Sequence, residues 1–128
     1  MTGQVHHEVA LLSVPVRAPG QPAFALEFVI DTGFTGYLTL PVAAVGALGL
    51  DFLRRMPANL ADDTTINVSV YALLIVWHGQ EREVEVLATG RRPLLGTRLL
   101  QDARLSADWT RGGLVEVVPL TQESAGNA

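Results

Sequence analysis

The stretch that decides the fold reads Phe28-Val29-Ile30-Asp31-Thr32-Gly33-Phe34-Thr35-Gly36. Its three opening apolar residues run directly into Asp31, and a Thr-Gly pair follows. Because a carboxylate without partners is costly to bury, an aspartate at the end of an apolar run is usually paired, neutralised or used in chemistry. Gly33 and Gly36 permit backbone shapes, including positive φ, that other residues resist. The stretch therefore predicts a strand that ends in a tight loop and presents one carboxylate.

An ordinary turn is the alternative interpretation of the same residues. An aspartate in a turn commonly accepts hydrogen bonds from the amides of its own loop. A bare Asp-Thr-Gly is also short enough to occur by chance in many chains. The rest of the sequence has to decide between the two interpretations.

The segment before Asp31 predicts a hairpin. Residues 9–16 are rich in Val and Leu, and residues 23–30 alternate large apolar side chains with smaller or charged ones. Between them, residues 17–22 carry the Pro and Gly of a turn. After the loop, residues 37–40 predict a short strand, and residues 41–48 predict a short helix that starts at proline and ends before glycine.

The middle of the chain predicts a second, longer hairpin. Residues 50–60 are compatible with a strand, and residues 61–64 are polar and turn-prone. Residues 65–77 alternate at first and then become continuously apolar, which is typical of a strand that starts exposed and enters a core. Residues 78–81 predict a turn in which His78 is exposed, and residues 83–87 pair back.

The last third of the chain predicts a short helix and two strands. Leu99, Leu100 and Ala103 favour a helix over residues 97–103 with one buried stripe, and Thr97 is a candidate N-cap. Two strands, 105–109 and 114–120, follow around a glycine-containing turn, and the polar tail 121–128 is expected to be disordered.

Composition narrows the class of protein. The 128 residues fit one domain, residues 1–128, with its core at about 8–120. Nine arginines, no lysine and thirteen acidic residues give a net charge of −4, which gives no support to a nucleic-acid partner. The longest apolar run, residues 70–77, is too short for a membrane-spanning helix. Since residues 1–8 also lack the layout of a signal peptide, a cytoplasmic protein without a membrane partner is expected.

No metal or other cofactor is expected. The chain has no cysteine, which excludes disulfides, thiolate catalysis and cysteine-ligated metals. The adjacent histidines His6 and His7 lie near a polar terminus, and Asp62-Asp63 lacks the spacing of a calcium loop. Solvated side chains are the better interpretation of both pairs. Trp77 and Trp109 are expected in the core or at a contact between two copies of the chain.

The order of these motifs resembles the retropepsin-like aspartic proteases, in particular their small single-domain bacterial and archaeal members. The resemblance runs from about residue 9 to residue 120. It is carried by Asp31-Thr32-Gly33 after an apolar strand, by Thr35-Gly36, by the β-rich middle with its polar hairpin, and by Leu94-Leu95-Gly96 before a short helix. It implies an all-β fold, a closed β-barrel or sandwich with one short C-terminal helix and a flap hairpin, in a homodimer.

The resemblance also implies roles for individual residues. Asp31 would be the catalytic aspartate, Thr32 would brace two such loops against each other, and Gly33 would lie against bound substrate. The motif 94–96 would pack under the loop, and the tip at 61–64 would be the flap. The residues expected around a peptide are Thr35, Leu38, Ala61, Asp62, Asp63, Thr64, Ile66, Leu94, Leu95 and Gly96.

Two positions depart from the family pattern. In viral members the second residue after Asp-Thr-Gly is often acidic and pairs with an arginine directly after the Leu-Leu-Gly-type motif. Thr35 and Thr97 stand at those two places here, so the ion pair is lost on both sides. The flap tip of related proteins often carries glycine where this chain has Asp63.

Peptide hydrolysis of this type needs two carboxylates, one to take a proton from water and one to protonate the carbonyl oxygen. Because the chain contains one Asp-Thr-Gly, the second carboxylate is expected from a second copy related by a twofold axis. Residues 9–16 and 114–120 are candidates for a sheet between the two copies. Apolar residues in the cleft, Leu38, Ile66 and Leu94, predict extended peptide or protein substrates with large apolar side chains.

Two other functions stay open at this point. The first is a protease-like dimer that binds peptides but has lost useful catalysis. The second is a β-barrel protein that binds a small ligand, in which Asp31 is only a turn residue.

Overall fold

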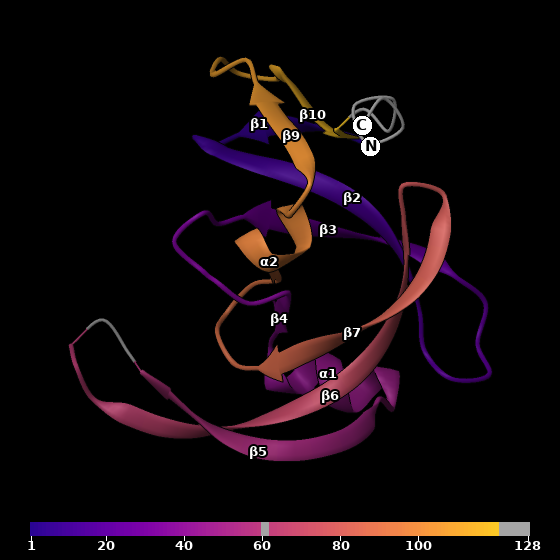
Figure 1. The fold of residues 1–128 in the computed structure, drawn as a ribbon, viewed down its shortest axis with the longest axis vertical. Helices are drawn as coiled ribbons and strands as arrows, with labels where there is room; N and C mark the ends of the chain where they lie inside the picture. Colours follow the sequence, from indigo (N-terminus) through magenta and orange to yellow (C-terminus); the bar gives the residue numbers. More distant parts are fainter. Residues whose placement is uncertain (60–61, 121–128) are drawn as a thin grey trace, which may run out of the picture.

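Strands carry most of the chain, as the alternating apolar residues predict. The computed structural model describes residues 1–59 and 62–120, shown in Figure 1. In chain order the strands of these residues are β1 (Thr2–His6), β2 (Val9–Arg17), β3 (Phe24–Ile30), β4 (Leu38–Leu40), β5 (Asp51–Asn59), β6 (Thr65–Trp77), β7 (Gln80–Ala88), β8 (Leu94–Leu95), β9 (Ala103–Ala107) and β10 (Leu114–Pro119). The helices are α1 (Val42–Leu48) and α2 (Thr97–Leu100).

All ten strands belong to one sheet in the order β5-β6-β7-β4-β8-β3-β2-β1-β10-β9. A further pairing of β6 with β2, at Val16↔Ile75 and Arg17↔Leu74, closes the central strands into a ring. From this ring β5 extends on one side, and β1, β10 and β9 extend on the other (Figure 1). The mostly β fold is confirmed, and the structure has a ring with two extensions where the sequence predicts a closed barrel.

The core fills the inside of the ring. Phe28, Leu73 and Ile75 are among its largest buried side chains. Each such side chain contributes roughly 1.5–3 kcal/mol by leaving water. On β6 the first residues are exposed and the strand enters the core at Val68, as predicted. Buried and half-buried residues then alternate up to Trp77, apart from the buried pair Ala72 and Leu73, although the end of the strand is continuously apolar.

Several boundaries follow the sequence closely. Strand β6 spans the predicted residues 65–77, and β2 pairs with β3 in the hairpin predicted before Asp31. Helix α1 ends at Gly49, whose φ of 64° is the left-handed conformation that glycine adopts without strain. The β5–β6 hairpin that corresponds to the predicted flap is also present.

The predicted helix over residues 97–103 is too long. Helix α2 stops at Leu100, because Asp102 turns the chain with a φ of 63° and Ala103 begins a strand that pairs with Pro119. Thr97 is also not the N-cap. Gly96 holds that position, and Thr97 is the first helical residue.

Strand β1 was not predicted, because Val5 is its only large apolar residue. Its presence also removes a predicted interface. Strand β2 pairs with β1 and β3, and β10 pairs with β1 and β9, so neither has a free edge for a sheet between two copies. The terminal strands of the sheet are β5 and β9 instead.

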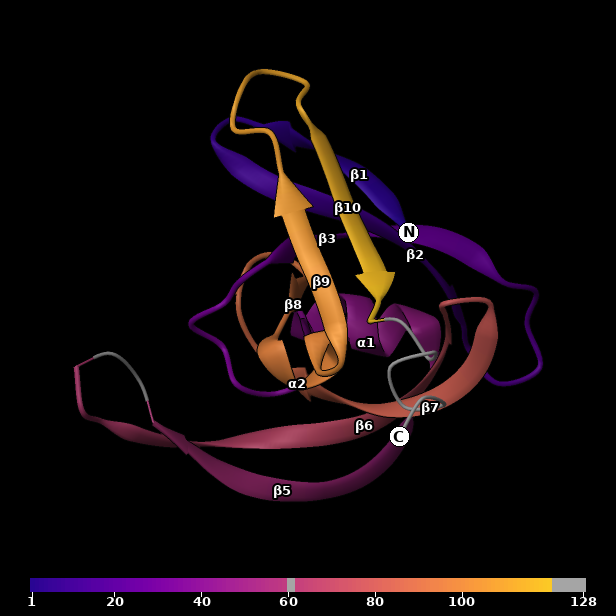
Figure 2. The ribbon, with the colours of Figure 1, turned by 45° about the horizontal axis from the view of Figure 1, so that its top comes forward.

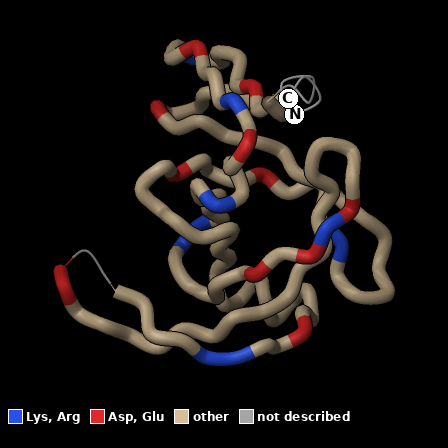
Figure 3. Tube along the Cα trace, in the orientation of Figure 1, with Lys and Arg blue, Asp and Glu red and all other residues tan. Residues whose placement is uncertain are grey.

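Two predictions concern residues outside the described part of the chain, namely Ala61 at the hairpin tip and the tail at 121–128. The described helices are all too short or too polar to cross a membrane. Arginines and acidic residues are scattered along the described chain rather than gathered on one segment (Figure 3).

An ion pair across β6 provides a test of how the outer hairpin is held. Arg54 on β5 donates two hydrogen bonds, of 2.8 and 2.7 Å, to the carboxylate of Glu85 on β7. This interaction lowers the pKa of Glu85 below its ordinary value of 4.5. Since the pKa is lowered in the folded state, the pair contributes stability above pH 4.5, and the contribution is lost as the pH falls through the lowered value.

We expect Glu85→Gln to lower the free energy of unfolding slightly at pH 7, and the difference from the native chain to vanish in acid and shrink in concentrated salt. Urea unfolding at a series of pH values measures this difference. Glu83→Gln on the same strand is the control, because Glu83 has no ion pair among the described residues. An equal loss at neutral and acidic pH would show that the carboxylate charge is not the cause.

Candidate active site at Asp31

The Asp31 loop, residues 31–37, connects β3 to β4 and lies at the left of Figure 1. Strand β8 pairs in parallel with β3, at Ile30↔Leu95, and antiparallel with β4, at Leu38↔Leu95. One short strand therefore lies between the strand that enters the loop and the strand that leaves it. This arrangement fixes both ends of the loop on the sheet.

Backbone hydrogen bonds hold the loop along its length. The Asp31 amide donates to the carbonyl of Leu95, and the Gly96 amide donates to the carbonyl of Tyr37, both at 2.9 Å. The first two amides of α2, those of Thr97 and Arg98, donate to the carbonyls of Phe34 and Gly36 at 2.8 and 3.2 Å. The first amides of a helix have no partner within the helix. Here the Asp31 loop supplies those partners.

Gly96 is required by the close approach of these two segments. A Cβ atom at Gly96 would collide with the carbonyl oxygens of Gly36 and Phe34 and with the Phe34 ring. The glycine of the Leu94-Leu95-Gly96 motif thus lets the loop lie directly on the start of α2, and no larger residue fits without moving backbone.

The carboxylate of Asp31 is partly buried, and its Oδ1 accepts a hydrogen bond of 2.9 Å from the Gly33 amide. This bond alone also fits the ordinary turn that the sequence left open. The bracing by β8 and α2 goes beyond what a turn requires, because it fixes the backbone on both sides of one carboxylate.

Three threonines lie in or beside the loop, Thr32 and Thr35 within it and Thr97 at the start of α2. Thr32 is exposed, and within residues 1–59 and 62–120 its hydroxyl makes no hydrogen bond. The hydroxyl of Thr97 donates to the carbonyl of Phe34 at 3.3 Å. This uncharged hydroxyl at the start of α2 therefore helps to hold the loop. Thr35 is exposed.

The residues predicted around a peptide are divided between surface and core. Leu38 is fully buried in the core, so the prediction that it lines a cleft is wrong. Leu95 is also fully buried, and it pairs with β3 and β4, the strands on the two sides of the loop. Leu94 is partly buried, and Ile66 on β6 is 38% exposed.

The backbone at the described part of the β5–β6 hairpin tip adopts, at Asp63, a conformation that glycine favours. Asp63 has a φ of 67°, the left-handed conformation that glycine favours and that Asp tolerates better than most residues. Beside it, Asp62 Oδ1 accepts hydrogen bonds from the amide and hydroxyl of Thr64, and these bonds lower the pKa of Asp62. The described part of the tip thus keeps a glycine-like turn without glycine.

Sequence reasoning missed some neighbours of the site. The Tyr37 ring lies 5.7 and 5.6 Å from the guanidinium groups of Arg82 and Arg98, which are distant in sequence. Phe34 covers Gly36 and Gly96, and an aromatic residue between two glycines was the available signal.

His78 was predicted to be exposed and is instead half-buried, with Nε2 lacking a partner among the described residues. Burial and the nearby amino-terminal charge lower its pKa.

We expect Gly96→Ala to destabilise the protein by about 1–3 kcal/mol, because the new methyl group forces the loop off α2. Gly46→Ala is the matched control. Gly46 lies inside α1 with open space around its Cβ position, so alanine should stabilise the protein by up to about 1 kcal/mol. Urea unfolding measures both changes, and equal effects of the two variants would contradict the close approach at Gly96.

No family model, no curated protein and no solved structure matches this chain. The case for a function therefore depends on the geometry around Asp31.

Proposed function

We propose that this protein is an aspartic endopeptidase of the retropepsin type, active as a homodimer. The observation that carries the proposal is the bracing of the Asp31 loop, which β8 and α2 hold from Asp31 to Tyr37 by backbone hydrogen bonds. A carboxylate fixed in this way, and only partly buried, is prepared for chemistry.

The reaction needs two such carboxylates close together. Because both cannot ionise cheaply at short distance, they share one proton. The ionised carboxylate takes a proton from water as the water oxygen attacks the peptide carbonyl carbon, and the protonated carboxylic acid gives its proton to the carbonyl oxygen. The carboxylate that is now ionised takes a proton from one hydroxyl of the resulting diol, the C–N bond breaks, and the amine leaves with the proton of the other carboxyl group.

Each chain contributes one Asp31, so a second copy supplies the other carboxylate. A twofold axis beside the loop brings the two Asp31 residues face to face. The exposed Thr32 hydroxyl supports this assembly, because it has no partner within the described chain and is free to donate to the partner copy.

The β5–β6 hairpin suits an extended peptide as substrate. It reaches out on the same side of the molecule as the Asp31 loop (Figure 1). Ile66 is partly exposed there, and Phe34 is partly exposed in the loop itself. An extended peptide can be held by backbone hydrogen bonds while alternate side chains contact such apolar residues. Large apolar residues are therefore proposed on either side of the cut.

We expect Asp31→Asn to reduce cleavage of a diverse peptide mixture by at least ~10²–10⁴-fold, since the nearly isosteric amide cannot act as acid or base. Mass spectrometry from mildly acidic to neutral pH measures the products. Asp51→Asn, at the exposed start of β5, is the matched control and should keep full activity. Cleavage by both variants would indicate another mechanism. No cleavage by a folded native dimer would favour the peptide-binding module.

A mixing experiment tests whether the two carboxylates come from two chains. When inactive Asp31→Asn chains are added in excess and exchange with native chains, most native chains end in mixed dimers with one aspartate. Activity per native chain should then fall steeply, whereas added Asp51→Asn should not lower it. Activity that is unaffected by the Asp31→Asn chains would contradict a site shared between copies.

A further inference from the structure

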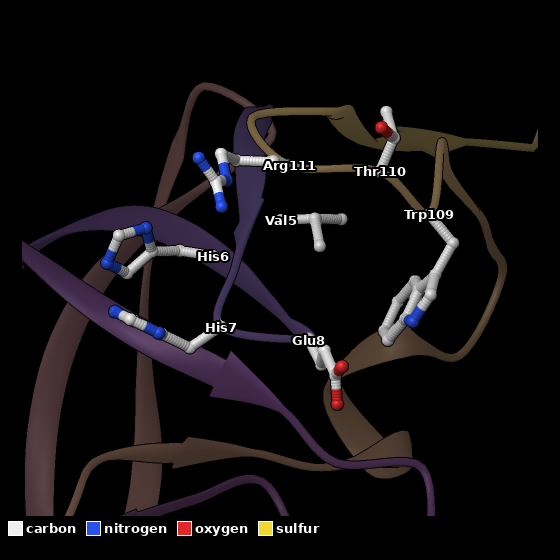
Figure 4. A pocket seen from close by; sticks show the side chains of 7 residues that line it. All are labelled: Val5, His6, His7, Glu8, Trp109, Thr110 and Arg111. Carbon is white, nitrogen blue, oxygen red and sulfur yellow. The ribbon is translucent and has the colours of Figure 1, made fainter.

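A wide hollow opens at the end of the sheet, away from the core. Its volume is about 870 Å³, and its walls are residues 5–8, where β1 turns into β2, and residues 109–111, where β9 turns into β10. Figure 4 shows the side chains of both turns around this space, with Val5 at its floor. The two turns are named here the terminal cradle.

Strand register brings the terminal cradle to the same edge of the sheet as Asp31. Val29, which is two residues before Asp31, pairs with Leu11 of β2. Ala10, the next residue of β2 toward that edge, pairs with Val5, and Gln4 pairs with Leu114 of β10. In that direction β3 leads to Asp31, β2 and β1 lead to the turn between them, and β10 leads to the β9–β10 turn. Figures 1 and 2 agree, since both turns and the Asp31 loop lie on one side of the molecule.

A partner copy that presents a second Asp31 must therefore face this edge. The edges of β1, β2 and β10 cannot make the contact here, because these strands are paired on both sides, and of the described strands at this end β9 alone has an open edge. Side chains of the terminal cradle are the other groups available at this end.

Those side chains are suited to contact a protein. Trp109 is 62% exposed, and large aromatic residues left in water are typical anchors of interfaces. Val5 at the floor is apolar but only 3% exposed, so the apolar surface open to a partner is mainly the Trp109 ring. That ring gains stability when a partner removes it from water.

The charges of the terminal cradle are self-complementary. Arg111 comes from the β9–β10 turn and Glu8 from the β1–β2 turn, and Figure 4 shows the two side chains at different places around the hollow. Neither Arg111 nor Glu8 forms an ion pair within the described chain. Under a twofold axis, a contact of residue i with residue j is repeated as j with i. Arg111 of each copy can then meet Glu8 of the other.

We propose that the terminal cradle is the dimer contact of this protein, and that it receives the Trp109–Arg111 segment of a second copy of the chain. The inference rests on the proposed function, because the shared active site is what requires a second copy at this edge. Arg111 pairs with Glu8 of the partner subunit, and the two Trp109 side chains leave water as the turns pack together.

The first test measures molecular mass by sedimentation equilibrium, which does not depend on activity. Trp109→Ser should weaken the native dimer by about 30-fold or more, the effect of losing an interface anchor. Phe24→Ser is the matched control, because Phe24 is 44% exposed at the opposite end of β3. A dimer that Trp109→Ser leaves unchanged would overturn the proposal, as would a native chain that stays monomeric.

The second test uses charge reversal and mixing. Arg111→Glu places two acidic residues at each contact, and Glu8→Arg places two arginines there, so each variant alone should be mostly monomeric. When the two variants are mixed, every contact again has opposite charges, and the mass of a dimer should return. Only pairing between chains gives this result, and mixtures that stay monomeric while native chains dimerise would overturn the assigned contact.

These outcomes separate the contact from the proposed function. If cleavage depends on Asp31 but the dimer's mass is unchanged by Trp109→Ser and by the charge reversals, the function is retained and the contact is overturned. A dimer that depends on Trp109 and recovers on mixing, yet cleaves nothing, would support the contact and contradict the peptidase.

Discussion

The site depends on the direct backbone contact between the Asp31 loop and the start of α2. Gly96 makes the contact possible, since any Cβ there would collide with the carbonyl oxygens of Gly36 and Phe34. The contact lets the free amides at the start of a very short helix serve as donors to the loop. A helix of one turn has little stability of its own, so loop and helix hold each other, and Leu99 anchors the pair in the core.

Three features of the described chain support the second copy that we propose. A braced carboxylate, an exposed threonine hydroxyl without a partner in the described chain, and an exposed tryptophan all lie toward one edge of the sheet. In a single chain the exposed Trp109 ring is unfavourable in water, and the Thr32 hydroxyl has no hydrogen-bond partner among the described residues. Together they are explained by one twofold contact that completes a pair of aspartates and covers the apolar surface, which is the assembly we propose.

Local patterns predicted the elements that local forces decide. The alternation before Asp31 and the apolar run into Trp77 gave the right strands, because a strand with one buried face must repeat every second residue. Strand β1 and the terminal cradle were missed, because they depend on pairing between residues such as Gln4 and Leu114, more than a hundred positions apart. The position of Asp31 in a loop at the end of a strand was predictable from the apolar run before it. The burial of Leu38 was not, because it is decided by the strands that pair on both sides of β4.

The hydrogen bonds by which β8 and α2 hold the Asp31 loop involve no ionisable group. They come from backbone amides and from the hydroxyl of Thr97, and neither gains or loses a proton between strongly acidic and neutral conditions. A carboxylate–guanidinium brace in the same place would weaken once its acid was protonated. The backbone that positions Asp31 is thus held by β8 and α2 in the same way in acid as at neutral pH, and a carboxylate takes part only in the bond that Asp31 Oδ1 accepts from the Gly33 amide within the loop.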